Sequence, residues 1–154
     1  MDPIKSTIIE LYCNQRNHVQ AWDIAIELFQ QQPTGQNALL MCSVAMGLLH
    51  TNKLRILVDS YIYRCAIETV DAYSRDTDID CNTRVMATVI AFVGMFELEM
   101  EGYYQAMLRA VTLTWRCAGL NADLQHSIKH IMNIYVERVN SGDFTKNLMY
   151  ISGV

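Results

Sequence analysis

Proline is scarce in this sequence, and glycine interrupts it only rarely. The 154 residues include two prolines, Pro3 and Pro33, and seven glycines. No segment alternates strictly between apolar and polar residues, whereas apolar residues recur at helical spacing along most of the chain. Because a half-buried strand needs that alternation, the sequence predicts an all-α fold.

Positive charge is also in short supply. Lysine and arginine total 12 against 16 aspartates and glutamates, which gives a net charge of −4. No short stretch concentrates lysine and arginine, and binding to a phosphate backbone requires such a cluster. The composition therefore argues against a nucleic-acid partner.

Long apolar runs are missing as well. The most hydrophobic segment, Val85 to Phe96, has twelve residues without a formal charge, fewer than the roughly 18–20 that cross a bilayer. The first residues, MDPIKSTIIE, are polar, and the final LMYISGV is too short for a tail anchor, so we expect neither a signal peptide nor a membrane span. These features predict a soluble, cytoplasmic protein.

The cysteines show no paired pattern. Their number is odd, and no CxxC occurs among Cys13, Cys42, Cys65, Cys81 and Cys117. Such a set argues against a disulfide scaffold and for a reducing compartment. Four of them lie in hydrophobic surroundings, where a thiol behaves as a small apolar group, and the fifth, Cys81, is expected to be reactive.

Catalytic and metal-binding motifs are absent from the sequence. There is no GxSxG, P-loop, GxGxxG or Cys/His set. His126 and His130 are four residues apart and could share a helix face, but HSIKH lacks the glutamate of the metalloprotease motif and further ligands. We therefore predict no enzyme activity, no metal and no cofactor.

Helical spacing divides the chain into seven or eight segments. The predicted helices cover about 4–12, 19–31, 37–49, 53–74 (in one or two pieces), a segment around 85–96, 103–118, 121–139 and a short stretch near the C-terminus, with Gly102 as a helix stop. Because Val85 to Phe96 is apolar on every face, other helices should surround it. The expected architecture is a single domain, residues 1–154, with amphipathic helices around a central hydrophobic hairpin.

Arg84 stands directly before this apolar segment. A cation in the first turn of a helix is mildly disfavoured by the helix dipole. A carboxylate partner is therefore expected, either an acid of the preceding loop (Asp76, Asp78 or Asp80) or an acid on a ligand.

The stretch SRD…CNTRVMATVIAFVG resembles the first Bcl-homology region of the Bcl-2 apoptosis-regulator family. That region has an Arg-Asp pair that ends one helix, then Asn-Trp-Gly-Arg at the start of a buried central helix, then an alanine three residues on. The matching residues here are Arg75, Asp76, Asn82, Arg84 and Ala87, with Thr83 in place of Trp-Gly.

The downstream sequence is similar to the same family. Trp115 stands about thirty residues beyond the arginine and is followed by Leu120-Asn121, as in family members. LNADLQHSIKHI resembles the lead-in to the second homology region, with Leu124 and Ile128 in step. The resemblance covers about residues 66–128.

The resemblance implies a divergent viral pro-survival member with a Bcl-2-like helical bundle. Such a protein sequesters the BH-3 helix of pro-apoptotic relatives, such as Bim, Bak or Bax, in a hydrophobic groove. Arg84 would pair with the aspartate of the BH-3 helix, and the other implied groove residues are Asn82, Val85, Thr88, Tyr73, Thr69, Leu48 and Val44.

Other roles are compatible with the same resemblance. A Bcl-2-fold viral scaffold could inhibit innate immune signalling without binding BH-3 ligands, and an open groove could support a homodimer. LRILVD, residues 54–59, looks like a degenerate BH-3 core in which Val58 replaces a small residue, which favours the pro-survival role. A viral member would act in the host cytosol, or at mitochondria through its partners.

Overall fold

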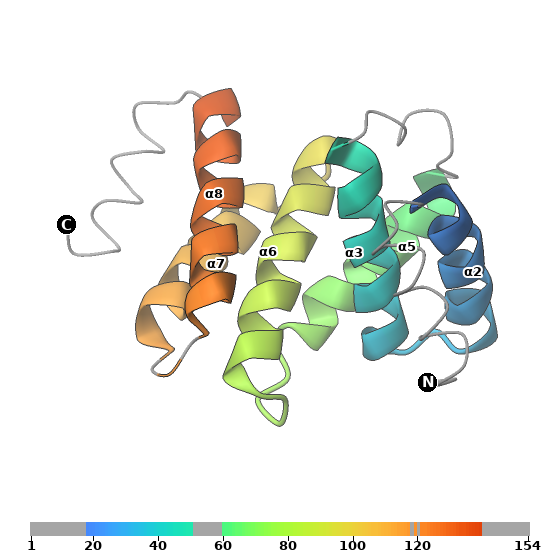
Figure 1. The fold of residues 1–154 in the computed structure, drawn as a ribbon, viewed down its shortest axis with the longest axis horizontal. Coiled ribbons are helices and arrows are strands. Elements are labelled where there is room, and N and C mark those ends of the chain that lie inside the picture. The colour runs from blue at the N-terminus through green and yellow to red at the C-terminus, as the bar shows by residue number, and fades with distance from the viewer. Residues whose placement is uncertain (1–17, 51–59, 118, 120, 140–154) are drawn as a thin grey trace. The chain divides into compact units, whose positions relative to one another are not determined.

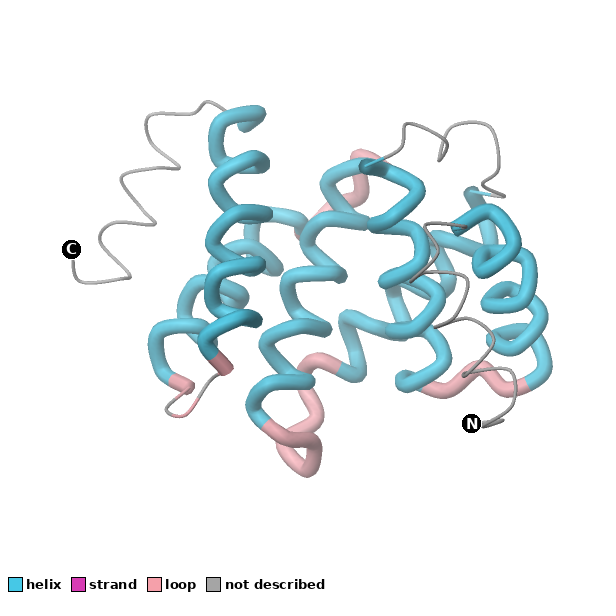
Figure 2. The backbone as a smooth tube through the Cα atoms, viewed as in Figure 1, coloured by secondary structure: helices cyan, strands magenta, loops and turns pink. Residues whose placement is uncertain are grey.

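The computed structural model describes residues 18–50, 60–117, 119 and 121–139 (Figure 1). These residues form no strand (Figure 2), and their helices are α2 (His18–Gln31), α3 (Gly35–His50), α5 (Ser60–Tyr73), α6 (Cys81–Glu97), α7 (Tyr103–Arg116) and α8 (Ala122–Val139). The predicted all-α character is confirmed for this part of the chain. The predicted helix at 4–12, the C-terminal helix and the segment 54–59 lie outside the described residues, so the total of seven or eight stays a prediction.

The chain divides into two compact units, residues 1–73 and residues 74–154. The first contains α2, α3 and α5, and the second contains α6, α7 and α8. A single domain over the whole chain stays a prediction, and each unit is described by itself.

In the first unit, a short turn reverses the chain between α2 and α3. Pro33 lies two residues after Gln31, the last residue of α2, and its lack of a backbone N–H prevents the helix from continuing. The hydroxyl of Thr34 accepts the backbone N–H of Asn37 at 3.2 Å, and the Asn37 side chain donates to the carbonyl of Gln32 at 2.9 Å. These bonds satisfy polar groups at the helix junction. Helix α3 contacts both α2 and α5, which accounts for its nearly uniform apolar character.

The core of the first unit combines aromatic and small side chains. Trp22 and Tyr63, both buried, meet edge to face with ring centroids 5.9 Å apart. Gly35, the first residue of α3, lies against Tyr73. An added Cβ there would stand 2.8 Å from the Cβ of Tyr73 and closer still to its ring, so a side chain would push α3 away from α5. Cys42 is buried, and burial raises the pKa of its thiol, which confirms it as an apolar core residue.

The second unit is arranged around α6. Figure 1 shows α7 running back along α6 in the opposite direction, and α6 also contacts α8. Ten of its residues are buried, namely Val85, Ala87, Thr88, Val89, Ile90, Ala91, Phe92, Val93, Gly94 and Met95. Since fully burying a large apolar side chain contributes roughly 1.5–3 kcal/mol, this helix is a main source of stability.

The connection from α6 to α7 differs from the sequence prediction. Helix α6 ends at Glu97, and Leu98 and Glu99 close its last turn by donating backbone N–H groups to Gly94 and Phe96. Gly102 was expected to stop this helix, but it directly precedes α7, with φ +90°. Glycine is favoured there because other residues rarely adopt that backbone conformation.

Candidate functional site

The polar loop before α6 folds back to cap the helix. One carboxylate oxygen of Asp80 accepts the backbone N–H of Thr83 at 2.9 Å, and the other accepts the Thr83 hydroxyl at 2.8 Å. The Thr83 backbone N–H, followed by the hydroxyl, lowers the pKa of Asp80 below its ordinary value. Asp80 is therefore an N-cap residue that stays ionised at neutral pH.

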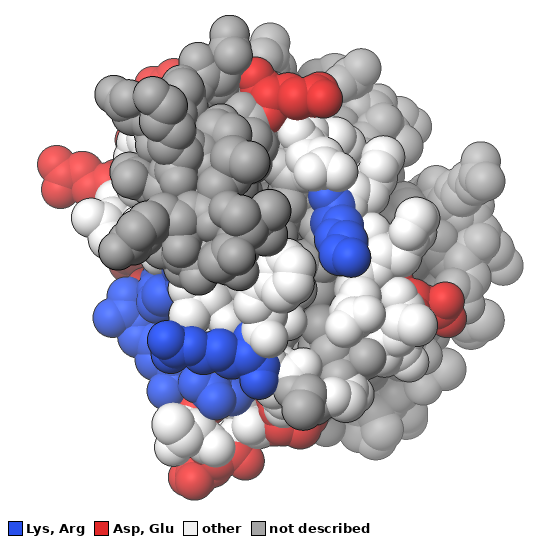
Figure 3. Space-filling model, turned by 90° about the vertical axis from the view of Figure 1, so that its left-hand side faces the viewer, with Lys and Arg blue, Asp and Glu red and all other residues white. Residues whose placement is uncertain are grey.

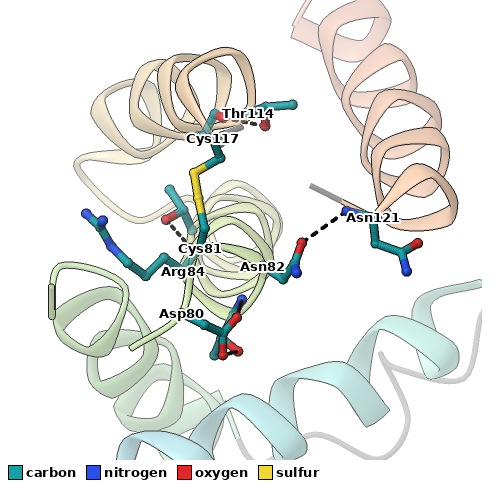
Figure 4. The surroundings of a disulfide bond; sticks show 10 residues. Asp80, Cys81, Asn82, Arg84, Thr114, Cys117 and Asn121 are labelled. Atoms are coloured by element: carbon teal, nitrogen blue, oxygen red, sulfur yellow. Dashed lines mark hydrogen bonds between the residues drawn. A yellow bond between two sulfur atoms is a disulfide. The ribbon is translucent and has the colours of Figure 1, made fainter. Parts of the chain in front are cut away.

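Arg84 lies in the first turn of α6 and is half-buried. Its Nε is buried and has no hydrogen-bond partner, and no ion pair joins its guanidinium to any residue that the structure describes. Figure 4 shows the guanidinium directed away from Asp80, whose carboxylate is engaged by Thr83. Asp78 donates its backbone N–H to Asp76 in the loop at 2.9 Å. The acids of the loop before α6, which the sequence suggested as partners, therefore do not pair with Arg84.

A buried donor without a partner is unfavourable. It costs about 1–3 kcal/mol relative to a satisfied one, and more where the group is charged. Protein side chains rarely retain such a group unless a ligand or solvent can reach it. Among the described residues of this unit, Arg84 is therefore the side chain with the clearest need for a further acceptor.

Arg84 lines an open pocket of about 390 Å³ within the second unit. The lining residues, which define the arginine pocket, are Ser74, Arg75, Arg84, Leu108, Arg109, Thr112, Leu113 and Arg116. Four of them are arginines and none is acidic. Figure 3 shows basic side chains gathered into a patch on one face of the molecule.

A hydrogen bond connects the loop side of the pocket to α7. Nη1 of Arg109 donates to the hydroxyl of Ser74 at 3.3 Å, and Ser74 is buried. Arg84 comes from α6, whereas Arg109 and Arg116 come from α7. The antiparallel pairing of these helices thus brings together arginines that are far apart in the sequence.

A disulfide between Cys81 and Cys117 joins the start of α6 to the end of α7, with the Cα atoms 6.1 Å apart (Figure 4). Such a Cα separation is usual for a disulfide. The prediction of five unpaired thiols, with Cys81 reactive, is therefore wrong. The two cysteines are 36 positions apart and become neighbours only when the hairpin forms, so no local motif announces the pair. Cys42 and Cys65 are free thiols, and the cysteine pattern no longer supports a reducing compartment.

Four of the predicted groove residues belong to the first unit. Val44 and Leu48 on α3 are buried, with 1% and 0% of their surface exposed. On α5, the Thr69 hydroxyl donates within its helix to the carbonyl of Cys65 at 2.8 Å, and Tyr73 is half-buried. Their convergence with residues of the second unit in one groove stays a prediction.

The other four lie at the start of α6. The side-chain oxygen of Asn82 accepts the backbone N–H of Asn121 at 3.2 Å, so Asn82 connects α6 to the start of α8. Val85 and Thr88 are fully buried, and the Thr88 hydroxyl donates to the carbonyl of Arg84 at 2.7 Å. Only Arg84 among these four lines the arginine pocket.

Arg109 and Arg116, which also line the arginine pocket, were not predicted as site residues. They are seven positions apart on α7, which corresponds to two helical turns and places them on one face. That spacing was readable in the sequence. Their proximity to Arg84 was not, because it depends on the antiparallel pairing of two helices.

Other candidate residues form no second site. His126 and His130 are exposed on α8, and no group of three or more potential metal ligands occurs among the described residues. Trp115, which was compared with the family tryptophan on sequence alone, is on α7 and is 61% exposed.

None of the helices in the described ranges is long and apolar enough to cross a membrane.

Comparisons with known proteins identify no relative of this chain. Comparison with protein-family models, curated proteins and solved structures finds no match to this chain. The resemblance to the Bcl-2 family therefore depends on the motif residues themselves.

Proposed function

We propose that this protein is an anti-apoptotic member of the Bcl-2 type that sequesters the BH-3 helix of pro-apoptotic relatives in a hydrophobic groove. The observation that carries the proposal is the state of Arg84. Its guanidinium stands at the start of a buried helix, and its Nε is buried without a hydrogen-bond partner among the described residues. In the proposed complex, the aspartate of the BH-3 helix is its partner.

The chemistry of the ligand contact follows from the arginine fork. A guanidinium can donate two parallel hydrogen bonds to one carboxylate, which fixes both the position and the direction of the ligand helix. Apolar side chains of the ligand would supply most of the affinity, at roughly 25 cal/mol per Å² of buried apolar surface before binding costs are subtracted. Arg84 would therefore set the register of the ligand helix.

Two observations support this reading over an internal role for Arg84. Asp80, the nearest acid before α6, is held by Thr83, so it does not neutralise the arginine. The ten buried residues of α6 also fit the central helix that the family resemblance implies. The position of Arg84 at the start of that helix matches the position of the family arginine.

The direct test is the affinity of a BH-3 peptide for Arg84→Ala and Arg84→Glu. We expect each substitution to weaken binding by about 2 kcal/mol or more, which is roughly a thirtyfold increase in Kd. Lys129→Ala, which removes an exposed cation from α8, is the matched control and should bind as the wild type does. Micromolar or tighter binding that ignores both Arg84 substitutions would remove the role of the arginine.

A second function is favoured by the burial of four implied groove residues. Val44, Leu48, Val85 and Thr88 are each at most 1% exposed, whereas a receptive groove needs such side chains within reach of its ligand. A Bcl-2-fold viral scaffold that inhibits innate immune signalling without a BH-3 ligand would keep them covered.

Calorimetric titration with a panel of BH-3 peptides separates the two functions. Binding of any BH-3 peptide at micromolar concentration supports sequestration, and failure of every peptide supports the scaffold. A homodimer formed through the groove belongs to the first function, since a bound BH-3 peptide should then dissociate it in gel filtration.

A further inference from the structure

Two of the arginines that line the arginine pocket are available to a ligand. The Nε of Arg84 is buried without a hydrogen-bond partner, and Arg116 is exposed and makes no side-chain hydrogen bond or ion pair with any residue that the structure describes. Arg75 and Arg109 take part in interactions of their own, one of which is the bond from Arg109 to Ser74. Only Arg84 and Arg116 are therefore counted as cations that a ligand can use.

The pocket extends along α7. Leu108, Thr112 and Arg116 follow one another at intervals of four residues, which places them on one face of the helix, and Leu113 lies beside them. These four residues define the α7 strip. At a rise of 1.5 Å per residue, the two ends of the strip are about 12 Å apart along the helix axis. Arg116 is exposed and the other three are half-buried, so a ligand can reach them.

The α7 strip differs in exposure from the groove residues that the family resemblance implies in the same unit. Val85 and Thr88 have 0% of their surface exposed, whereas both leucines of the strip are half-buried. A ligand carboxylate that reaches Arg84 in the arginine pocket stands beside the α7 residues that line it. The position of Arg84 thus directs a ligand toward α7.

We propose that the BH-3 helix lies along the α7 strip, with its aspartate on Arg84, apolar side chains against Leu108 and Leu113, and a second acidic side chain at Arg116. This inference rests on the proposed function and deepens it, because no residue of the strip is among the implied groove residues. An amphipathic helix presents its anchors at intervals of three or four residues. That periodicity matches a strip whose own residues repeat every four positions.

Charge favours an acidic helix over a second copy of this chain as the occupant. A two-fold contact through the α7 strip would bring Arg84 and Arg116 of one copy toward the same arginines of the other. Like charges at close range repel, whereas ligand carboxylates form charge-assisted hydrogen bonds with both guanidinium groups. Leu108 and Leu113 supply the apolar contact that a single anion would leave unused.

The disulfide holds the two arginines of the proposed contact in place. Cys81 is three residues before Arg84, and Cys117 follows Arg116 directly. The bond fixes the start of α6 against the end of α7 before any ligand binds. Preorganisation of this kind lowers the conformational cost of binding.

The experiment measures the Kd of the tightest-binding BH-3 peptide of the panel for variants of the oxidised, full-length chain. Leu108→Ser and Leu113→Ser should each weaken binding by about tenfold, and Arg116→Gln by about threefold because its contact is more exposed. Leu124→Ser and Lys129→Gln make the same chemical changes at a half-buried leucine and an exposed cation of α8. These two controls should alter Kd by less than about twofold, and thermal unfolding confirms that each variant is folded.

A charge-reversal experiment tests the second acidic contact through a gain of binding, which a folding defect does not produce. Arg116→Glu should weaken binding of the unmodified peptide by about tenfold. Lysine in place of one acidic residue of the peptide, other than the aspartate that meets Arg84, should restore most of this loss. Failure of every lysine-substituted peptide to restore binding would overturn the contact at Arg116.

The outcome is separable from that of the proposed function. If no BH-3 peptide binds at micromolar concentration, sequestration fails and the contact with α7 fails with it. If a peptide binds and Arg84→Gln weakens it, but the Leu108, Leu113 and Arg116 variants bind as the wild type does, sequestration stands and the α7 strip is wrong. A wild-type dimer that Leu108→Ser dissociates and the peptide does not would make a second copy the occupant and would also contradict the proposal.

Discussion

The two ends of α6 are held in place by different interactions. At its C-terminal end, Phe96 meets Tyr103 and Tyr135 edge to face at centroid distances of 5.5 and 5.2 Å. Phe92 adds a further edge-to-face contact with Tyr135 at 5.6 Å. The Tyr135 hydroxyl donates to the Glu97 carboxylate at 2.8 Å, so this polar atom within the aromatic cluster is satisfied.

At the N-terminal end of α6, covalent and polar bonds replace aromatic packing. Asp80 caps the helix, the disulfide links Cys81 to Cys117, and the Asn82 side chain accepts the backbone N–H of Asn121. Each of these bonds is directional and joins particular atoms. The first turn of α6, whose four residues are all half-buried, is therefore fixed in position by a few bonds.

The C-terminal end of α6 mainly stabilises the hairpin, whereas the N-terminal end mainly positions the residues of the first turn. Aromatic packing stabilises the hairpin in proportion to the area that it buries, and it tolerates small shifts of the rings. Directional bonds at the start of α6 instead hold Arg84 in a set position. We therefore expect substitutions in the aromatic cluster to lower stability alone, and loss of the disulfide to weaken ligand binding as well as stability.

The largest expected effect on stability comes from Phe92→Ala. Phe92 is fully buried, and truncation of a buried phenylalanine typically costs about 3–5 kcal/mol, because the loss of apolar burial is followed by a cavity. Denaturant unfolding measures the change. Trp115→Ala, at a residue that is 61% exposed, is the matched control and should change stability by less than about 1 kcal/mol.

The comparison would fail if Phe92→Ala lowered BH-3 peptide affinity in the folded protein while it cost little stability. That result would mean that the aromatic end also positions Arg84. A large loss of stability with unchanged affinity, measured well below the unfolding midpoint, would support the separation of roles.

Replacing both bonded cysteines, Cys81→Ser with Cys117→Ser, is the second prediction. Because the pair closes a loop across 36 positions, its loss should cost about 2–4 kcal/mol by the loop-entropy relation. Binding of a BH-3 peptide should also weaken, since the start of α6, which carries Arg84, would lose its covalent link to α7. Cys65→Ser, at a free thiol on α5, is the control for the chemical change itself.

The disulfide has an independent readout. A thiol reagent added to the unfolded, unreduced protein should leave Cys81 and Cys117 unlabelled, and prior reduction should expose both. Labelling of Cys81 without reduction would contradict the bond. A double variant with the stability of the wild type but weakened ligand binding would sharpen the comparison, since the bond would then act on position alone.

The helices were largely predictable because their signals are local. Spacing predicted residues 19–31 for α2, and the helix is His18–Gln31, where Pro33 ends the pattern. The prediction of 121–139 for α8 differs by one residue from Ala122–Val139. The apolar run of α6 indicated a helix covered on several sides, and its ten buried residues agree.

The site was less predictable because its contacts are not local. Arg84 was recognised from its unusual place beside an apolar run. The disulfide and the approach of Arg109 and Arg116 to Arg84 depend on how α6 and α7 pair, and no spacing within either helix specifies that pairing. The capping role of Asp80 was not foreseen when the loop acids were suggested as partners of Arg84. Asp80 is an N-cap, and the hydrogen bond that it accepts from the backbone N–H of Thr83 competes with any salt bridge to Arg84.

The smallest expected effect concerns the cap itself and its dependence on pH. The Thr83 backbone N–H and hydroxyl hold the pKa of Asp80 below its ordinary value, so the folded protein favours the ionised form. A lowered folded-state pKa contributes stability that is fully present above the unfolded-state pKa and is lost as the pH falls through the folded-state pKa. Asp80→Ala should therefore lower Tm modestly at pH 7, and its difference from the wild type should shrink steadily from about pH 4 downwards.

Asp80→Asn isolates the charge from the hydrogen bond. Asparagine also caps helices well, so this variant should retain most of the wild-type stability at pH 7 and lack the wild-type change below about pH 4. Thermal unfolding of the three proteins at pH 7, 5 and 3 provides the measurement. A difference between the wild type and Asp80→Ala that stayed constant with pH would mean that the carboxylate does not cap as an anion.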